Sequence, residues 1–211
     1  MPSLQLLPRR APAQLLDPVV AVLARTGVTP NALSTLGFLG NVGAGAFAGS
    51  GWFLAAGLTT LAASALDLFD GALARATGRV TRFGAVYDSV LDRLSEAAVL
   101  GGLLYYYTAG ESDATMAGVI FAAVVGSVLV SYVRARAQGV GVDLREGLFT
   151  RAERVLLTGA ALIIGQAWPP AVRIALWALA VLANVTAVQR LLAVRLALRE
   201  ADSTDSEGGP R

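Results

Sequence analysis

The chain has 211 residues, of which 55% are hydrophobic and 15% are charged, and its mean hydropathy is +0.60. Because a soluble domain of this length is seldom more than about half apolar, this composition predicts an all-α integral membrane protein, with a soluble helical protein as the less favoured alternative. Cysteine and histidine are both absent, which excludes disulfides, thiolate or imidazole metal ligands, and any catalytic triad that depends on histidine.

The two ends of the chain are expected to lie outside the membrane core. Residues 1–30 are predicted to form a cytoplasmic or interfacial segment. Within it, residues 18–25 have the pattern of a short amphipathic helix that lies along the membrane surface. Residues 199–211 are polar and rich in glycine and serine, which predicts a disordered cytoplasmic tail.

Six apolar segments follow one another between these ends, and each has roughly the length that a helix needs to cross a bilayer. They are 32–48, 52–73, 85–107, 114–133, 155–168 and 171–192. The fifth is short, so a shallow or re-entrant helix is the alternative for it. Residues 31–198 are therefore expected to form a membrane domain of six transmembrane helices.

The charges between these segments are distributed unequally. One set of connections, together with both ends of the chain, carries clusters of arginine, whereas the opposite set carries only Glu111, Asp113 and Arg173. Positively charged residues accumulate on the cytoplasmic side of membrane proteins. We therefore expect both termini and the arginine-rich connections to face the cytoplasm.

Four aspartates lie in or beside the second and third apolar segments. Asp67 and Asp70 are three residues apart, and Asp88 and Asp92 are four apart, so each pair shares one helix face. A hairpin of two helices would bring the pairs together near the cytoplasmic surface. Because four neighbouring carboxylates repel one another, the arrangement favours divalent cations with oxygen ligands, such as Mg²⁺, Mn²⁺ or Ca²⁺. The alternative is that these residues cap helices or are solvated at the membrane edge.

Small and basic residues surround the aspartates. Gly71 and Ala74 leave part of the helix surface bare, which lets a phosphate or a flat group approach the backbone. Arg75 places a guanidinium near such an anion. For Arg75 alone, a positive charge at a cytoplasmic helix end is an equally good explanation.

The spacing D-x2-D-G-x2-A-R-x8-G-x3-D-x3-D, from Asp67 to Asp92, resembles the signature of the CDP-alcohol phosphotransferase family, and all eight of its fixed positions are present. The resemblance implies a bacterial plasma membrane homodimer with six transmembrane helices and a polar cavity open to the cytoplasm. It also implies transfer of a phosphatidyl group from CDP-diacylglycerol to an alcohol, assisted by two metal ions, Mg²⁺ or alternatively Mn²⁺. Asp67, Asp70 and Asp88 would hold metal, and Asp92 would be the general base and a ligand of the second ion.

The resemblance extends to a nucleotide site. This site is formed by the small and basic residues of the motif, by the segment TPNALST that precedes the first apolar segment, and by the threonine of TRFG. The residues assigned in this way to CDP-diacylglycerol are Asn31, Ser34, Gly71, Ala74, Arg75, Thr81 and Gly84.

A second set of motifs resembles one branch of the family, the actinobacterial phosphatidylinositol phosphate synthases. They are SYVRARAQGVGVDLREGLFTRAERVLL, from Ser131, WPP at Trp168, and VQR at Val188. The resemblance implies that the acceptor is D-myo-inositol 3-phosphate, also named 1L-myo-inositol 1-phosphate, and that the product is phosphatidylinositol phosphate.

The same branch assigns the acceptor phosphate to a pocket formed by Ser131, Arg134, Arg136, Arg154 and Arg190. Position 134 is usually lysine in these enzymes, so the arginine here keeps the charge but alters the donor geometry. From the residues alone, these arginines and Arg151, which is three residues before Arg154, suit a phosphate pocket and the positive-inside rule equally well. The resemblance favours the pocket.

Other functions fit parts of this pattern. A phosphatidylglycerophosphate synthase would use glycerol 3-phosphate, which also suits an arginine pocket. A membrane cation transporter would use the aspartates, but transport predicts acids near mid-membrane and on both sides, whereas these acids cluster at one face beside arginines. A non-catalytic lipid-binding protein leaves the motif spacing unexplained. Nothing in the sequence indicates a nucleic-acid partner.

Overall fold

The structure is a computed structural model that describes residues 13–144 and 149–207, and these residues form helices and no strand. The all-α expectation is thereby confirmed. In chain order the elements are α1 (Ala13–Thr26), α2 (Pro30–Gly49), α3 (Phe53–Ala76), α4 (Arg82–Tyr105), the short π-helix η1 (Tyr106–Gly110), α5 (Ala114–Gly139), α6 (Arg151–Gly165) and α7 (Pro170–Glu207).

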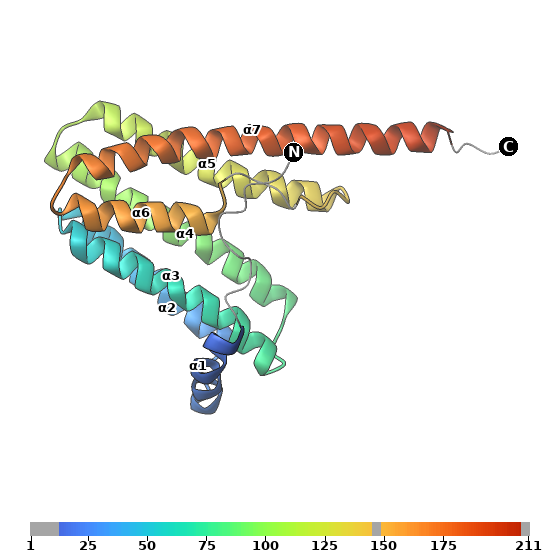
Figure 1. The fold of residues 1–211 in the computed structure, drawn as a ribbon, viewed down its shortest axis with the longest axis horizontal. Helices are drawn as coiled ribbons and strands as arrows, with labels where there is room; N and C mark the ends of the chain where they lie inside the picture. Colours follow the sequence, from blue (N-terminus) through green and yellow to red (C-terminus); the bar gives the residue numbers. More distant parts are fainter. Residues whose placement is uncertain (1–12, 145–148, 208–211) are drawn as a thin grey trace.

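The helices run alternately in opposite directions, so that their connections gather at two ends of the bundle (Figure 1). α2 packs against α3 and α4, α5 packs against α7, and α6 packs against α3 and α7. At the end where α3 turns into α4, α1 is attached through Val20, which packs with Leu33 of α2 and Leu73 of α3. The C-terminal part of α7 extends past the rest of the bundle.

Three helical stretches of the described chain are long and apolar enough to cross a membrane: Phe53–Ala76, Ala114–Gly139 and Pro170–Glu200. The chain therefore has the character of a membrane protein. α6 has 15 residues and is about 22 Å long, which is shorter than the roughly 30 Å of a bilayer's hydrocarbon core. A count of six spans and an interfacial position for α1 remain predictions.

α7 is longer than the sixth apolar segment. It continues to Glu207, so residues 199–207 are helical, in contrast to the disordered tail expected from their polar composition. The physical reason is that no glycine or proline interrupts the chain between Pro170 and Gly208. The expectations for residues 1–12 and 208–211 lie outside the described residues.

Glycines set the spacing of the helices that carry the site. A Cβ atom on Gly102 of α4 would lie 1.9 Å from the carbonyl oxygen of Gly45 in α2, which is possible only for glycine. Between α3 and α6, a Cβ atom on Gly57 would lie 2.7 Å from the carbonyl oxygen of Gly159. α2 is thus pressed against α4, and α6 against α3.

Ion pairs tie the helices together at the end of the bundle that is poor in arginine. The Asp113 carboxylate accepts a hydrogen bond from the backbone N–H of Met116 at 3.1 Å and pairs with Arg173 of α7 at 2.7 Å. These two contacts hold the pKa of Asp113 below its usual range. Arg173 also pairs with Glu111 at 2.9 Å. The charges expected at this end therefore join α7 to the start of α5.

Candidate active site

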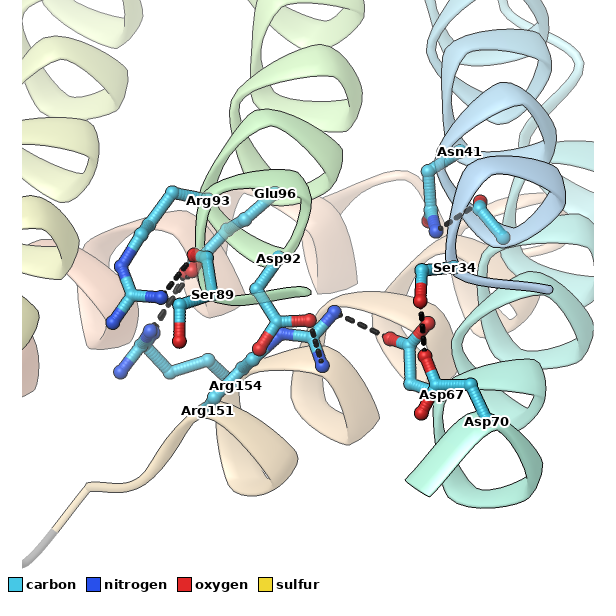
Figure 2. A network of polar contacts seen from close by, with 11 residues as sticks. Ser34, Asn41, Asp67, Asp70, Ser89, Asp92, Arg93, Glu96, Arg151 and Arg154 are labelled. Atoms are coloured by element: carbon cyan, nitrogen blue, oxygen red, sulfur yellow. Dashed lines mark hydrogen bonds and ion pairs between the residues drawn. The ribbon is translucent and has the colours of Figure 1, made fainter. Parts of the chain in front are cut away.

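The four aspartates lie at the arginine-rich end of the bundle, on α3 and α4. The Asp67 and Asp92 side chains point toward each other from these two helices (Figure 2). Asp88 interacts electrostatically with Asp67 and Asp70. The structure therefore brings both pairs together, although not through a tight hairpin: α2 packs against both α3 and α4, and these two helices touch each other little.

Helix α2 supports the two carboxylates of α3. The Ser34 hydroxyl donates a hydrogen bond of 2.5 Å to Oδ2 of Asp70, which is buried. A Cβ atom on Gly37 would lie 2.9 Å from Oδ1 of Asp67, so glycine at this position leaves room for the Asp67 carboxylate. α2 thus fixes the α3 carboxylates through one hydrogen bond and one close approach.

A guanidinium lies between the two aspartate pairs. Nη2 of Arg151 is 2.7 Å from Oδ2 of Asp67, and its Nη1 is 2.9 Å from Oδ1 of Asp92. In this conformation no three acidic side chains of the described residues converge as one set of metal ligands. The oxygen donors nevertheless suit Mg²⁺ or Mn²⁺, and Arg151 is a cation held at the same carboxylates. The residues present therefore fit a divalent ion.

A cavity of about 310 Å³ opens beside the aspartates, between the starts of α2 and α4 and the end of α3. Every residue assigned from the sequence to CDP-diacylglycerol lines it, together with Asp70 and Asp88. Arg79 also lines it and was not predicted. We refer to this space, lined by residues 30–88, as the donor cavity, after the expectation that CDP-diacylglycerol binds there.

The turn between α3 and α4 gives the donor cavity its edge. Thr81 caps α4, since its Oγ1 accepts a hydrogen bond of 2.9 Å from the backbone N–H of Gly84. A Cβ atom on Gly84 would lie 2.9 Å from that Oγ1 and 3.4 Å from Oδ1 of Asn31. Gly84 is therefore packed closely by both polar side chains, and a larger residue would intrude on them.

A second cavity, of about 500 Å³, lies on the other side of Asp92. Its walls come from α4, α5, α6 and α7 and from Thr150 before α6. Four of the five residues predicted to bind the acceptor phosphate line it, namely Ser131, Arg134, Arg154 and Arg190. We refer to this space, lined by residues 89–190, as the acceptor cavity, after the expectation that the acceptor phosphate binds there.

Arg136 does not line the acceptor cavity, in contrast to the prediction. Its side chain is exposed, as is that of Arg134. It is two residues beyond Arg134 on α5, which turns it about 200° around the helix axis. The two arginines therefore point in nearly opposite directions, and only Arg134 reaches the cavity.

A buried ion pair forms one wall of the acceptor cavity. Nε and Nη2 of Arg154 donate to the two carboxylate oxygens of Glu96 at 2.7 and 2.8 Å, and Ser127 donates to the same carboxylate at 2.8 Å. Nη1 of Arg154 donates to the carbonyl oxygen of Phe149 at 3.3 Å. Arg154 therefore belongs to the cavity as predicted, but three of its nitrogens are already engaged.

Several residues of the acceptor cavity were not predicted from the sequence. They are Ser89, Arg93, Glu96, Val130 and Thr150. A signal existed for Glu96, because it follows Asp92 by four residues and continues the face of Asp88 and Asp92. No local pattern indicates that Arg151 reaches Asp67, which precedes it by 84 residues.

Comparisons with known proteins agree with this geometry. A model of the family described as CDP-alcohol phosphatidyltransferase matches residues 27–195. The phosphatidylinositol phosphate synthase of Mycobacterium marinum is 36% identical over 193 residues, which cover 89% of this chain and 82% of the relative. The protein of the same name from Streptomyces avermitilis is 35% identical over 199 residues, which cover 90% of this chain and 82% of the relative.

Solved structures agree as well. The crystal structure of Mycobacterium tuberculosis phosphatidylinositol phosphate synthase (PgsA1) with CDP-DAG bound has a TM-score of 0.80 and 32% identity, over 86% of this chain and 94% of that one. The structure of PgsA1 in complex with manganese and citrate has a TM-score of 0.80 and 33% identity, over 85% of this chain and 88% of that one. This chain belongs to the CDP-alcohol phosphatidyltransferase family.

Proposed function

We propose that this chain transfers the phosphatidyl group of CDP-diacylglycerol to 1L-myo-inositol 1-phosphate, which yields phosphatidylinositol phosphate and CMP. The observation that carries the proposal is the pair of cavities on either side of the aspartates. Asp70 and Asp88 line the donor cavity, and Asp92 lines the acceptor cavity. The relatives named phosphatidylinositol phosphate synthase, and the related structure with CDP-DAG bound, support the same assignment.

The donor cavity is suited to the cytidine diphosphate part of the lipid. Gly71, Ala74 and Gly84 present little side chain, so a nucleotide can approach the helix backbone. Arg75 and Arg79 supply positive charge for the pyrophosphate. Asn31 and Thr81 offer polar groups at the same edge.

The four aspartates would hold two divalent ions, Mg²⁺ or Mn²⁺. Their oxygen-only chemistry supports this assignment, as does the related structure in complex with manganese and citrate. When bound, such ions polarise phosphoryl oxygens and offset the charge that develops on the departing CMP.

Asp92 is the residue best placed to accept the proton of the acceptor. It lines the acceptor cavity and shares one helix face with Asp88 of the donor cavity. The inositol hydroxyl oxygen forms a bond to the lipid-bearing phosphorus, its proton passes to Asp92, and the phosphoanhydride bond to CMP breaks. A carboxylate is the natural base in a chain without histidine.

The acceptor cavity favours a small molecule that carries a phosphate. Its volume of about 500 Å³ falls within the roughly 300–1,000 Å³ of typical small-molecule sites. Arg134 and Arg190 line it from α5 and α7, and two guanidiniums can hold one phosphate. Ser131 adds a hydroxyl group.

The membrane arrangement completes the proposal. We infer six membrane helices in a bacterial plasma membrane, with both termini and both cavities on the cytoplasmic side, because the arginine-rich connections lie at the cavity end. The homodimer stays a prediction from the family resemblance.

The proposal is tested by CMP release from the full chain in lipid nanodiscs with CDP-diacylglycerol and Mg²⁺. Inositol phosphate, free inositol and glycerol 3-phosphate are compared as acceptors. We expect release with inositol phosphate alone. Release with glycerol 3-phosphate instead would contradict the assigned acceptor and favour a phosphatidylglycerophosphate synthase. No release with any acceptor from folded protein would contradict the transferase assignment for this chain.

A further inference from the structure

Arg151 belongs to both halves of the site. It is the first residue of α6 and lines the acceptor cavity. Its two terminal nitrogens contact Asp67 on α3 at 2.7 Å and Asp92 on α4 at 2.9 Å. Figure 2 shows the guanidinium between these two helices, with one carboxylate on each side. One side chain therefore connects the proposed metal ligands to the wall of the acceptor cavity.

Few contacts besides its two ion pairs hold the Arg151 guanidinium in place, so it can change partners. Its Nε is buried and has no hydrogen-bond partner among residues 13–144 and 149–207, so the described contacts of the guanidinium are those of its terminal nitrogens with the two carboxylates. This differs from Arg154 on the next turn of α6, whose Nε, Nη1 and Nη2 all donate hydrogen bonds. Losing the two carboxylates would leave Arg151 without its ion pairs, while Arg154 would keep its own.

A divalent cation and this guanidinium compete for the same oxygens. Both are positively charged, and like charges a few ångströms apart repel strongly in a partly buried site. When a cation binds these carboxylates, their electrostatic attraction for Arg151 weakens. Glu96 also acts on Arg151, but its carboxylate is already paired with Arg154. An anion in the acceptor cavity is therefore the alternative partner that we consider, because Arg151 lines that space and a guanidinium binds phosphate through two parallel hydrogen bonds.

We propose that Arg151 couples metal binding to acceptor binding. It pairs with Asp67 and Asp92 in the resting protein, is released from them when a divalent cation binds, and then pairs with the acceptor phosphate. This inference rests on the proposed function. Two consequences follow: the acceptor tightens metal binding, and the metal tightens acceptor binding by the same factor. In addition, Asp92 leaves its ion pair only as the site fills, so the base is not free beforehand.

The test measures Mn²⁺ binding to the full chain in nanodiscs by electron paramagnetic resonance, with and without 1L-myo-inositol 1-phosphate and in the absence of CDP-diacylglycerol. For the wild type, we expect the acceptor to lower the Kd for Mn²⁺ by about tenfold. For Arg151→Gln, we expect Mn²⁺ without acceptor to bind about tenfold more tightly than in the wild type, because the competing cation is gone. The acceptor should then have no further effect.

Two variants separate coupling from simple removal of charge. Arg134→Gln removes a positive charge from the same cavity without a contact to Asp67 or Asp92, so the Kd for Mn²⁺ without acceptor should stay within about twofold of the wild type. Arg151→Lys keeps the charge, but one ammonium cannot make the same two-point bridge. Its Kd for Mn²⁺ should lie between those of the wild type and Arg151→Gln.

An unchanged Kd for Mn²⁺ in Arg151→Gln, or an acceptor effect that persists in this variant, would overturn the coupling. A wild type whose Mn²⁺ affinity does not respond to the acceptor would overturn it as well. Inorganic phosphate is also tested in place of the acceptor. A lower Kd for Mn²⁺ with phosphate alone supports pairing of Arg151 with the phosphate group of the acceptor rather than with its inositol ring. These outcomes differ from a failure of the proposed function, which is the lack of CMP release by the wild type.

Discussion

The donor and acceptor cavities are built in different ways. The donor cavity is lined by residues 30–88, which form three consecutive helices and one short turn. The acceptor cavity is lined by residues 89–190, which come from four helices that meet only in the folded chain. One continuous stretch of sequence therefore specifies the first cavity, whereas long-range packing assembles the second.

The charges of the two cavities differ as well. The donor cavity has two aspartates and two arginines. The acceptor cavity has five arginines, but Arg154 is paired with Glu96, and Arg151 is paired with Asp67 and Asp92. The number of arginines around a cavity therefore overstates the positive charge that a ligand meets, because some guanidiniums are neutralised by the protein itself.

Asp92→Asn gives the largest expected effect, because Asp92 lines the acceptor cavity while Asp70 and Asp88 line the donor cavity. The amide cannot accept the hydroxyl proton, so turnover should fall by about 10²- to 10⁴-fold. Binding of CDP-diacylglycerol should remain largely intact, which can be measured by equilibrium binding of labelled lipid. Near-normal turnover would remove Asp92 as the base. Asp113→Asn, at the far end of the bundle, is the matched control and should retain activity.

Glu96→Ala tests whether the buried pair builds the acceptor cavity. The substitution leaves the Arg154 guanidinium buried without its carboxylate, which costs about 3–5 kcal/mol of stability, so the melting temperature should fall. Arg154 also loses its position, and the KM for inositol phosphate should rise about tenfold or more. The KM for CDP-diacylglycerol should change little, because Glu96 lies outside the donor cavity.

The double variant of Glu96→Ala with Arg154→Ala provides the control for that experiment. If Glu96 acts through Arg154, the effects on the acceptor KM are not additive, and Glu96→Ala adds little once Arg154 is gone. A fall in melting temperature with an unchanged acceptor KM would restrict the pair to a structural role.

The donor side could be predicted residue by residue because its signals are local. The spacing of Asp67, Asp70, Asp88 and Asp92 places carboxylates on helix faces, and the glycines mark where the backbone must be approached. All seven residues assigned to the nucleotide site line one cavity. Each of the six apolar segments likewise overlaps a helix, although the third continues from α4 into η1 and the fifth extends past the end of α6.

The acceptor side could be predicted only in part because its contacts join distant helices. The pairs of Arg151 with Asp67 and of Arg154 with Glu96 join residues 84 and 58 positions apart, and nothing near these residues indicates the partner. For Arg136, the structure differs from the prediction because two residues along α5 turn its side chain about 200° away from that of Arg134. At the end of α7, the polar composition of residues 199–207 predicts a disordered tail, whereas the absence of glycine and proline from this stretch permits the helix that is observed.

Ser34→Ala tests the donor side, where α2 holds a carboxylate of α3. Losing the 2.5 Å hydrogen bond to Asp70 removes about 1.5 kcal/mol, so Mn²⁺ or CDP-diacylglycerol should bind roughly tenfold more weakly. The acceptor KM should stay within about twofold if the cavities are as separate as their walls indicate. Ser50→Ala, at the other end of α2, removes a hydroxyl that donates to the carbonyl oxygen of Ala46, and it serves as the control.

The smallest expected effect is that of Arg136→Gln, which is compared with Arg134→Gln on the same helix. Arg134→Gln removes a guanidinium that lines the acceptor cavity, and loss of one charge-assisted hydrogen bond to a phosphate should raise the acceptor KM about tenfold. Arg136→Gln removes the same charge from the opposite side of α5, where the side chain does not line the cavity, so the acceptor KM should change by no more than about twofold. Equal effects of the two substitutions would mean that the acceptor responds to the overall charge of the helix end rather than to a pocket. A tenfold difference would show that the direction of each side chain, rather than the number of arginines, determines acceptor binding.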